Sequence, residues 1–352
     1  MHVFVTIPMS DGAPGRVHGF LTDLFASARP WPGEYWFVRT WEQTSGADCF
    51  QVSLASAHLG AGEAADRVRR VAAAHDLRPD VVEAPVEEVP SPLWNAGLGG
   101  PGFGAVARRL YRAAAPLLVQ LLPALGGDPA DRYRIAVRLM LANAGATLLE
   151  SEQRDLPSRG YAELLSLRLL SYRSHYEGVY ARATDPDSFE RRYAAHYERL
   201  GGYTRDLVRS CAVSGPSSDD PVTGGWVAMV RRHFSPVRDE FRAGRVVNAG
   251  LSIEDLNAGR AVPLPPTRFH TYLSAELEHL LHRDPDFLAF RLATSLLYSC
   301  LHTLGFSLVE RYLFCYLLAR ANEDVSGRET ADLQRELGAL ARQLVCTSPV
   351  TP

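Results

Sequence analysis

A polar stripe on one long segment carries the side chains best suited to move protons. The apolar spacing from 284 to 322 predicts a single helix, with Asp284 as its N-cap and Pro285 as its first residue. The stripe consists of Arg291, Ser295, Tyr298, Ser299, His302 and Phe306. Because leucines cover most of the remaining circumference, we expect a buried helix whose stripe faces a cavity. An amphipathic helix with a solvated polar edge fits the same pattern.

A second group of tyrosines and histidines is expected on another helix. Tyr172, His175 and Tyr176 are spaced i, i+3 and i+4, so a helix places them on one face, with Arg173 beside them. The next predicted helix repeats this trio as Tyr193, His196 and Tyr197. Tyrosine and histidine together can move protons near neutral pH when their pKa values are tuned. Tyrosines at this spacing also occur as half-buried core residues, which is the alternative.

The third group lies on a predicted β-hairpin near the N-terminus. Strand alternation places Phe37, Arg39 and Trp41 on one face. It likewise gives Cys49, Gln51 and Ser53 a common face. An arginine among aromatic side chains is costly unless it binds something, so Arg39 is a candidate binding residue. The alternative is an arginine at the edge of the sheet that extends outward to water.

Composition removes several classes of reaction. All 37 basic residues are arginine, and without lysine there is no Schiff base, pyridoxal phosphate anchor or Walker A loop. The sequence has no H-E-x-x-H, no G-x-S-x-G and no G-x-G-x-x-G after a strand, so neither a metal nor a nucleotide cofactor is expected. The five cysteines are never spaced C-x-x-C, which argues against a zinc site or a disulfide framework. The net charge of −3 argues against nucleic acid as a partner. The lack of a signal peptide and of long apolar runs predicts a soluble cytoplasmic protein.

The order of the predicted elements indicates an α+β fold. Strands at 3–7, 34–41, 49–54 and 81–89 alternate with helices at 15–28 and 61–75, which is a ferredoxin-like split β-α-β layer. Beyond a Pro/Gly-rich passage at 90–104, almost every segment has helical period. We therefore expect an N-terminal α/β layer at 1–95 packed on a large helical body at 96–352, as one integrated domain with the active site between them.

Three stretches, in order along the chain, together resemble one family. They are Tyr35-Trp36-Phe37-Val38-Arg39-Thr40, residues 171–177, and residues 299–306 followed by Glu310-Arg311. Each is similar to a motif of the lantibiotic-dehydratase C-terminal domain, also called the thiopeptide-type bacteriocin biosynthesis domain. Members that eliminate glutamate from glutamylated serine or threonine carry a histidine and two arginines where this chain has Cys49, Gln51 and Ser53. An asparagine-arginine pair of the family is replaced by Phe306-Ser307.

The loss of those arginines favours a sibling group, the thiopeptide pyridine synthases. The resemblance implies a cofactor-free formal [4+2] cycloaddition between two dehydroalanines of a modified precursor peptide. Loss of water and expulsion of the leader peptide then give the pyridine macrocycle. Glutamate elimination as part of a split dehydratase is the runner-up, and a non-catalytic leader-binding subunit is the third interpretation. The expected partner is the precursor peptide with its leader, with transient contact to dehydratase components.

This reaction assigns roles to the candidate residues. The amide before one dehydroalanine must tautomerise, and Tyr298, His302 and His175 are the expected proton donors and acceptors, with Ser295 and Ser299 orienting them. Arg39 is expected to polarise one amide carbonyl and Gln51 to hold a second. The remaining predicted substrate-binding residues are Ser53, Trp41, Tyr172, Arg173 and Tyr176. An acidic, leucine-rich leader would suit the arginine-rich surfaces of Arg67, Arg70 and Arg109.

Overall fold

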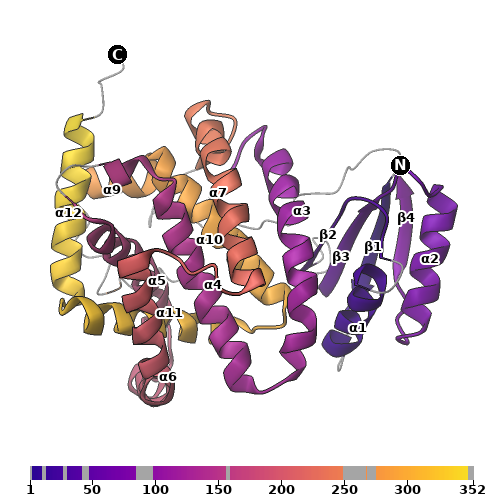
Figure 1. Ribbon diagram of the computed structural model, residues 1–352, viewed down its shortest axis with the longest axis horizontal. Helices are drawn as coiled ribbons and strands as arrows, with labels where there is room; N and C mark the ends of the chain where they lie inside the picture. Colours follow the sequence, from indigo (N-terminus) through magenta and orange to yellow (C-terminus); the bar gives the residue numbers. More distant parts are fainter. Residues whose placement is uncertain are drawn as a thin grey trace. The chain divides into compact units, whose positions relative to one another are not determined.

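The computed structural model describes residues 2–9, 13–26, 30–41, 47–84, 98–155, 159–248, 267 and 275–347. Within these ranges a four-stranded antiparallel sheet with its helices comes first, and mainly helical segments follow (Figure 1). The predicted α+β class is therefore confirmed. The predicted strand at 81–89 is described only as far as Ala84.

The N-terminal sheet has the strand order β2-β3-β1-β4. Its elements in chain order are β1 (His2–Pro8), α1 (Ala13–Phe25), β2 (Tyr35–Trp41), β3 (Asp48–Ala55), α2 (Ala61–Ala73) and β4 (Asp80–Ala84). β1 lies between β3 and β4 and is antiparallel to both, while β2 pairs with β3 as a hairpin. This is the split β-α-β arrangement that the sequence predicts.

Aromatic side chains cover both faces of β2. On one face the Phe25 ring of α1 stacks on Tyr35, with ring centroids 3.9 Å apart, and on Phe37 at 5.7 Å. On the other face Trp36 packs against Tyr111 of α3 (Phe103–Leu121), with centroids 6.1 Å apart. Because neighbouring strand residues point to opposite faces, α1 and α3 enclose β2 from two sides.

Helices make up most of the remaining chain. They are η1 (Leu122–Gly126), α4 (Pro129–Leu149), η2 (Glu152–Asp155), α5 (Tyr161–Tyr180), α6 (Pro186–Ser214), α7 (Pro221–Arg242), α9 (Ala275–His282), α10 (Pro285–Thr303), α11 (Leu308–Ser326) and α12 (Thr330–Thr347). Two short strands, β5 (Leu98–Gly99) and β6 (Val247–Asn248), pair in antiparallel orientation. Helix α11 packs along both α5 and α6.

The single helix predicted from 284 to 322 is wrong, because the chain breaks it into α10 and α11. Gly305 adopts φ +84°, a left-handed conformation that glycine accepts without a Cβ penalty. The amide of Gly305 donates to the carbonyl of His302, and that of Phe306 donates to the carbonyl of Leu301. This is a Schellman C-cap, which ends the helix and removes Phe306 from the predicted stripe.

Two compact units divide the chain. The sheet unit holds the N-terminal sheet together with Phe103–Arg132 and Ser295–Ser307, and the helical unit holds Tyr133–Thr294 and the chain from Leu308 onward. Helices α4 and α10 each contribute residues to both units. The domain boundary predicted at 95/96 lies within 85–97, outside the described residues, and stays a prediction. Among the described helices, none is long and apolar enough to cross a membrane.

Candidate active site

The second half of α10 is fixed to the edge of the sheet by Thr303. β2 is an edge strand, so every second backbone amide of this strand lacks a partner within the sheet. The buried Thr303 hydroxyl accepts a hydrogen bond from the Arg39 amide at 3.0 Å and donates to the Ser299 carbonyl at 2.9 Å. The Thr303 side chain thus gives an edge-strand amide its hydrogen-bond partner. It also holds the last turn of the helix that carries the predicted catalytic stripe.

His18 of α1 binds the same turn of α10. Its Nε2 lies 3.1 Å from the carbonyl oxygen of Thr303, which can only accept, so Nε2 carries the proton. Burial lowers the pKa of His18, and the positive charges of Arg132 and Arg39 lower it further. The ring is therefore neutral at physiological pH and supplies one N–H to an end carbonyl of the helix.

Arg132 encloses the loop that follows α10. Its guanidinium lies over the Phe306 ring, 5.0 Å from the centroid, and Nη2 donates to the Gly305 carbonyl at 3.5 Å. A cation at the C-terminal end of a helix is favoured by the helix dipole. The turn after the predicted catalytic stripe is therefore held from α1, from β2 and from Arg132.

Ser299 receives a hydrogen bond from a buried phenol. The hydroxyl of Tyr111 donates to Ser299 Oγ at 2.6 Å, and only 1% of Tyr111 is exposed. Burial raises the pKa of Tyr111, and the nearby Cys300 thiol raises it further, so the phenol keeps its proton. Among the described residues no acceptor for the Ser299 hydroxyl is found, so its O–H is available to another group. Such a chain of hydroxyls strengthens the last donor.

The other stripe residues lie on the same helix half. Ser295, Tyr298 and His302 are each half-buried and each contacts another residue. The structure thus places four predicted site residues, these three and Ser299, on three consecutive turns of α10 within the sheet unit. Arg291 belongs to the other half of the helix and donates to the Leu281 carbonyl at 3.1 Å.

The arginine of the hairpin already has an internal partner. Arg39 Nε and Nη2 bind the carboxylate of Asp48 on β3, at 3.0 Å and 2.5 Å. Arg39 lies opposite Phe50 in the register, whereas Gln51 lies opposite Val38. Arg39 and Gln51 therefore point to opposite faces of the sheet. Ser53 shares the face of Gln51 and is buried, and the side chain of Trp41 lies outside the described residues.

The predicted tyrosine cluster of α5 belongs to the helical unit. Tyr172 is fully buried and its hydroxyl donates to the Met140 carbonyl at 2.7 Å. Tyr176 is also fully buried and packs against Tyr193 and Tyr316, with ring centroids 6.0 and 4.9 Å away. Burial raises the pKa of both tyrosines, which favours the alternative interpretation of core residues for their rings.

Arg173 and His175 flank these tyrosines. Arg173 forms an ion pair with Glu177 at 2.7 Å and lies over the Tyr176 ring, 5.2 Å from its centroid. His175 is half-buried and is engaged with another residue. His175 belongs to the helical unit and His302 to the sheet unit, so their joint action stays a prediction.

The predicted leader-binding arginines lie on two helices. Arg67 and Arg70 are on α2, where Arg67 lies 5.6 Å from the Trp31 ring centroid, and Arg109 is on α3. α2 packs against β4 and α3 against β2, which are the opposite edges of the sheet. The structure therefore does not bring Arg109 beside the other two, and their role stays a prediction.

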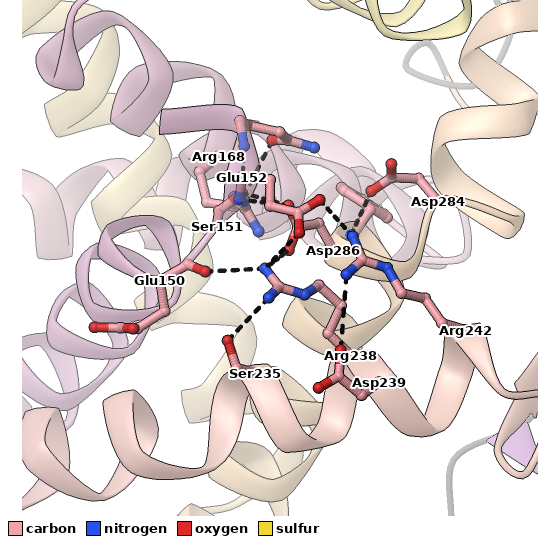
Figure 2. Close-up of polar contacts among 12 residues, drawn as sticks. Glu150, Ser151, Glu152, Arg168, Ser235, Arg238, Asp239, Arg242, Asp284 and Asp286 are labelled. Atoms are coloured by element: carbon pink, nitrogen blue, oxygen red, sulfur yellow. Dashed lines mark hydrogen bonds and ion pairs between the residues drawn. The ribbon is translucent and has the colours of Figure 1, made fainter. Parts of the chain in front are cut away.

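A buried charged network holds the first half of α10 in the helical unit (Figure 2). Asp286 accepts hydrogen bonds from the Ser151 hydroxyl at 3.0 Å and the Glu152 amide at 2.7 Å, and it pairs with Arg238 Nη1 at 3.2 Å. Asp284 caps the helix by accepting from the Phe287 amide at 2.7 Å, and burial raises its pKa. Arg168 lies against the Phe290 ring, 4.5 Å from the centroid. Both halves of α10 are therefore anchored by polar contacts.

Sequence reasoning did not identify Tyr111, His18, Thr303, Arg132 or Asp48. Thr303 follows Ser299 by one helical turn, so its place beside the stripe was open to prediction. The other contacts join residues far apart in the chain, such as His18 and Thr303, and no local pattern signals them. Among the described residues no three His, Cys, Asp or Glu side chains are grouped to hold a metal ion.

This fold, with its ferredoxin-like sheet and helical segments, is shared over nearly the whole chain with a solved pyridine synthase. That enzyme is TbtD, the pyridine synthase from thiomuracin biosynthesis, with a TM-score of 0.57 and 16% identity over 93% of this chain and 99% of TbtD. The crystal structure of TsrL is also similar, with a TM-score of 0.69 and 20% identity over 96% of this chain and 98% of TsrL. At such identities the likeness establishes the fold. No family model and no curated protein sequence matches the chain.

Proposed function

We propose that this protein is a pyridine synthase that acts on a modified thiopeptide precursor. The observation that carries the proposal is the similarity to TbtD, which covers 93% of this chain and 99% of that one, because it involves the sheet and the helical segments alike. The three sequence motifs support the same group independently. The proposed reaction uses no cofactor.

The reaction joins two dehydroalanines of one peptide. The amide before one of them tautomerises to an iminol, and the resulting azadiene adds to the alkene of the other, forming two bonds and a six-membered ring. The ring then loses its hydroxyl with a proton as water. Breakage of the C–N bond to the leader, with transfer of a ring proton to the departing amide nitrogen, gives the aromatic pyridine. Folding the peptide so that the alkenes meet supplies roughly 7 kcal/mol or more in well-oriented systems.

The residues on α10 suit the proton movements. Ser299, with Tyr111 behind it, offers an O–H to the amide oxygen or to the departing hydroxyl. Tyr298 and His302 lie within one turn of Ser299 and are the proposed proton donor and acceptor. Arg39 Nη1, which Asp48 does not bind, is the proposed donor to a second carbonyl.

Glutamate elimination is disfavoured by the composition of β3. Elimination requires cations that stabilise a departing glutamate carboxylate. At the positions where glutamate-eliminating members of the family carry a histidine and two arginines, this strand carries Cys49, Gln51 and Ser53. Cys49 and Ser53 are also buried, and neither side chain carries a cation.

The test is to mix the purified chain with a dehydrated, azole-bearing precursor and to follow the products by mass spectrometry. We expect a macrocycle that has lost water and the leader. A parallel reaction with a glutamylated precursor distinguishes the runner-up, since loss of glutamate there and no macrocycle in the first reaction would refute the proposal. Binding of the precursor without any conversion would favour the leader-binding subunit instead.

A further inference from the structure

A surface hollow lies in the helical unit, where α5 ends and both α6 and α11 begin. Its volume is about 600 Å³, within the range of small ligand sites. Val179 and Phe189 are among its apolar lining residues, together with Leu308 and Val309. Arg182 and Arg192 also line it. Neither the motifs nor the proposed reaction uses this hollow.

The apolar part of the hollow is open to solvent. Leu308 is 55% exposed and Val309 is 58% exposed. The other exposed large apolar side chains in the described ranges occur singly, at Val82, Val213 and Val247. The turn is also held in place, because the Tyr193 hydroxyl donates to the Val309 carbonyl at 2.8 Å. Two fixed, exposed apolar side chains therefore line this hollow.

The charged part of the hollow is positive. In the described ranges no carboxylate pairs with Arg182 or Arg192, and Arg192 lies 5.9 Å from the centroid of the Phe189 ring. Asp185 is the only carboxylate among the lining residues, and it already caps α6 by accepting from the Ser188 amide at 2.9 Å. The lining therefore carries two guanidinium groups and one carboxylate that is already engaged, and an anionic occupant would complement the positive charge.

We propose that this hollow binds an acidic peptide segment that also carries aliphatic side chains. An aliphatic side chain would rest on Leu308, Val309 and Phe189, and neighbouring carboxylates would pair with Arg182 and Arg192. An extended peptide fits better than a single small acid, because the two arginines belong to different elements, Arg182 after α5 and Arg192 on α6, and the same lining includes the apolar pair Leu308 and Val309. The inference goes beyond the proposed reaction, since it rests on the chemistry of this surface alone.

The test measures binding of a fluorescent peptide of alternating leucine and glutamate to the full chain by anisotropy. We expect saturable binding that weakens as salt is added. The double variant Arg182→Gln with Arg192→Gln should weaken binding about tenfold or more. Val309→Ser should weaken it in the same direction by removing apolar contact. Arg191→Gln is the matched control, because Arg191 is an exposed neighbour on the same helix that does not line the hollow.

Four results would overturn the inference. The first three are the absence of binding, equal binding of a peptide in which lysine replaces glutamate, and binding that the double variant leaves unchanged. The fourth is free glutamate that competes as well as the peptide, because the site would then recognise a small acid. Thermal unfolding of each variant checks that it is folded. If the chain binds the peptide but forms no macrocycle, this inference holds and the proposed function fails.

Discussion

Ser299 of α10 accepts a hydrogen bond from the buried phenol of Tyr111. This phenol is 1% exposed and keeps its proton. In the proposed reaction the serine would therefore offer its own O–H to the substrate without being ionised. Serine alone is a weak acid, and the role predicted for Ser299 from sequence was to orient its neighbours. The contact with Tyr111 leads us to propose that Ser299 is itself a donor.

Replacement of Tyr111 by phenylalanine tests this donor chain. We expect Tyr111→Phe and Ser299→Ala each to slow product formation by roughly tenfold to a hundredfold. The double variant should be no slower than the slower single variant, because the two hydroxyls act in one chain. Initial rates measured by mass spectrometry check this.

Tyr197→Phe is the control for Tyr111→Phe. The Tyr197 hydroxyl donates to Asp324 at 2.6 Å in the helical unit, whereas the polar stripe of α10 belongs to the sheet unit. This variant should keep the full rate. A Tyr111→Phe protein that is folded and as fast as the unmodified chain would remove Tyr111 from the account.

His18 should make stability depend on pH. Its pKa in the folded state lies below the ordinary histidine value of about 6.5, so between these two pKa values the unfolded chain binds more protons. The free energy of unfolding should therefore fall as the pH drops from about 7 through 6.5. His18→Gln keeps an N–H for the Thr303 carbonyl and cannot titrate, so it should lose less stability over the same range. Urea unfolding at both ends of the range measures the difference, and identical losses in the two proteins would contradict the assignment.

At the scale of elements, local periodicity predicted most of the fold and failed at one turn. The alternation of β1 and the helical spacing of α1 are properties of neighbouring residues, and both elements formed where expected. The run from 284 to 322 kept an apolar period on both sides of Gly305, and a single glycine is tolerated inside helices. The Schellman cap that ends α10 was therefore hidden by a pattern that continues into α11.

Gly305→Ala tests the cap. A left-handed residue with a Cβ costs about 1–2 kcal/mol, so the free energy of unfolding should fall by about that amount. The added methyl would lie 3.5 Å from His18 Cε1, an ordinary contact, so no steric clash is needed to explain the loss. Gly202→Ala, inside α6 with open space around it, should instead gain up to about 1 kcal/mol from helix propensity. Chemical denaturation compares the two, and equal effects would contradict the cap.

Asp286→Ala tests the network that holds the start of α10. The substitution removes the buried carboxylate and leaves Arg238 paired only with the half-exposed Glu152, at 3.5 Å, so the free energy of unfolding should fall by about 3 kcal/mol. Asp206→Ala breaks the exposed pair with Arg209, in which the side chains are 76% and 60% exposed, and should cost about 1 kcal/mol or less. Urea unfolding of both variants provides the comparison. A loss for Asp286→Ala no larger than that for Asp206→Ala would show that the network is not what anchors the helix.

At the scale of the whole molecule, sequence motifs predicted more than composition did. The α+β class and the order of the sheet followed from local patterns, and the resemblance to thiopeptide enzymes agrees with the solved structures of similar fold. The contacts that build the candidate site could not be predicted, because Arg39, Tyr111 and Ser299 lie on three segments that only folding brings together. The spacing of residues along the chain predicts the helix that carries the candidate site. It does not predict the residues from distant segments that contact this helix, such as Tyr111.

The absence of lysine from the whole chain is compatible with the proposed reaction. The proposed reaction draws its protons from hydroxyls and histidine, and arginine is used to hold carbonyl groups and carboxylates. Both anchored halves of α10 rely on arginine, through Arg132 at one end and Arg238 at the other. These roles need a permanent charge with a forked geometry, which lysine does not provide.

The mass of the released leader peptide tests the central claim most directly. Aromatisation by expulsion predicts that a dehydrated, azole-bearing precursor yields a leader that ends in a carboxamide, together with a macrocycle that has lost water. A leader that ends in a carboxylate, or a precursor that remains whole after prolonged incubation with the folded chain, would contradict the account.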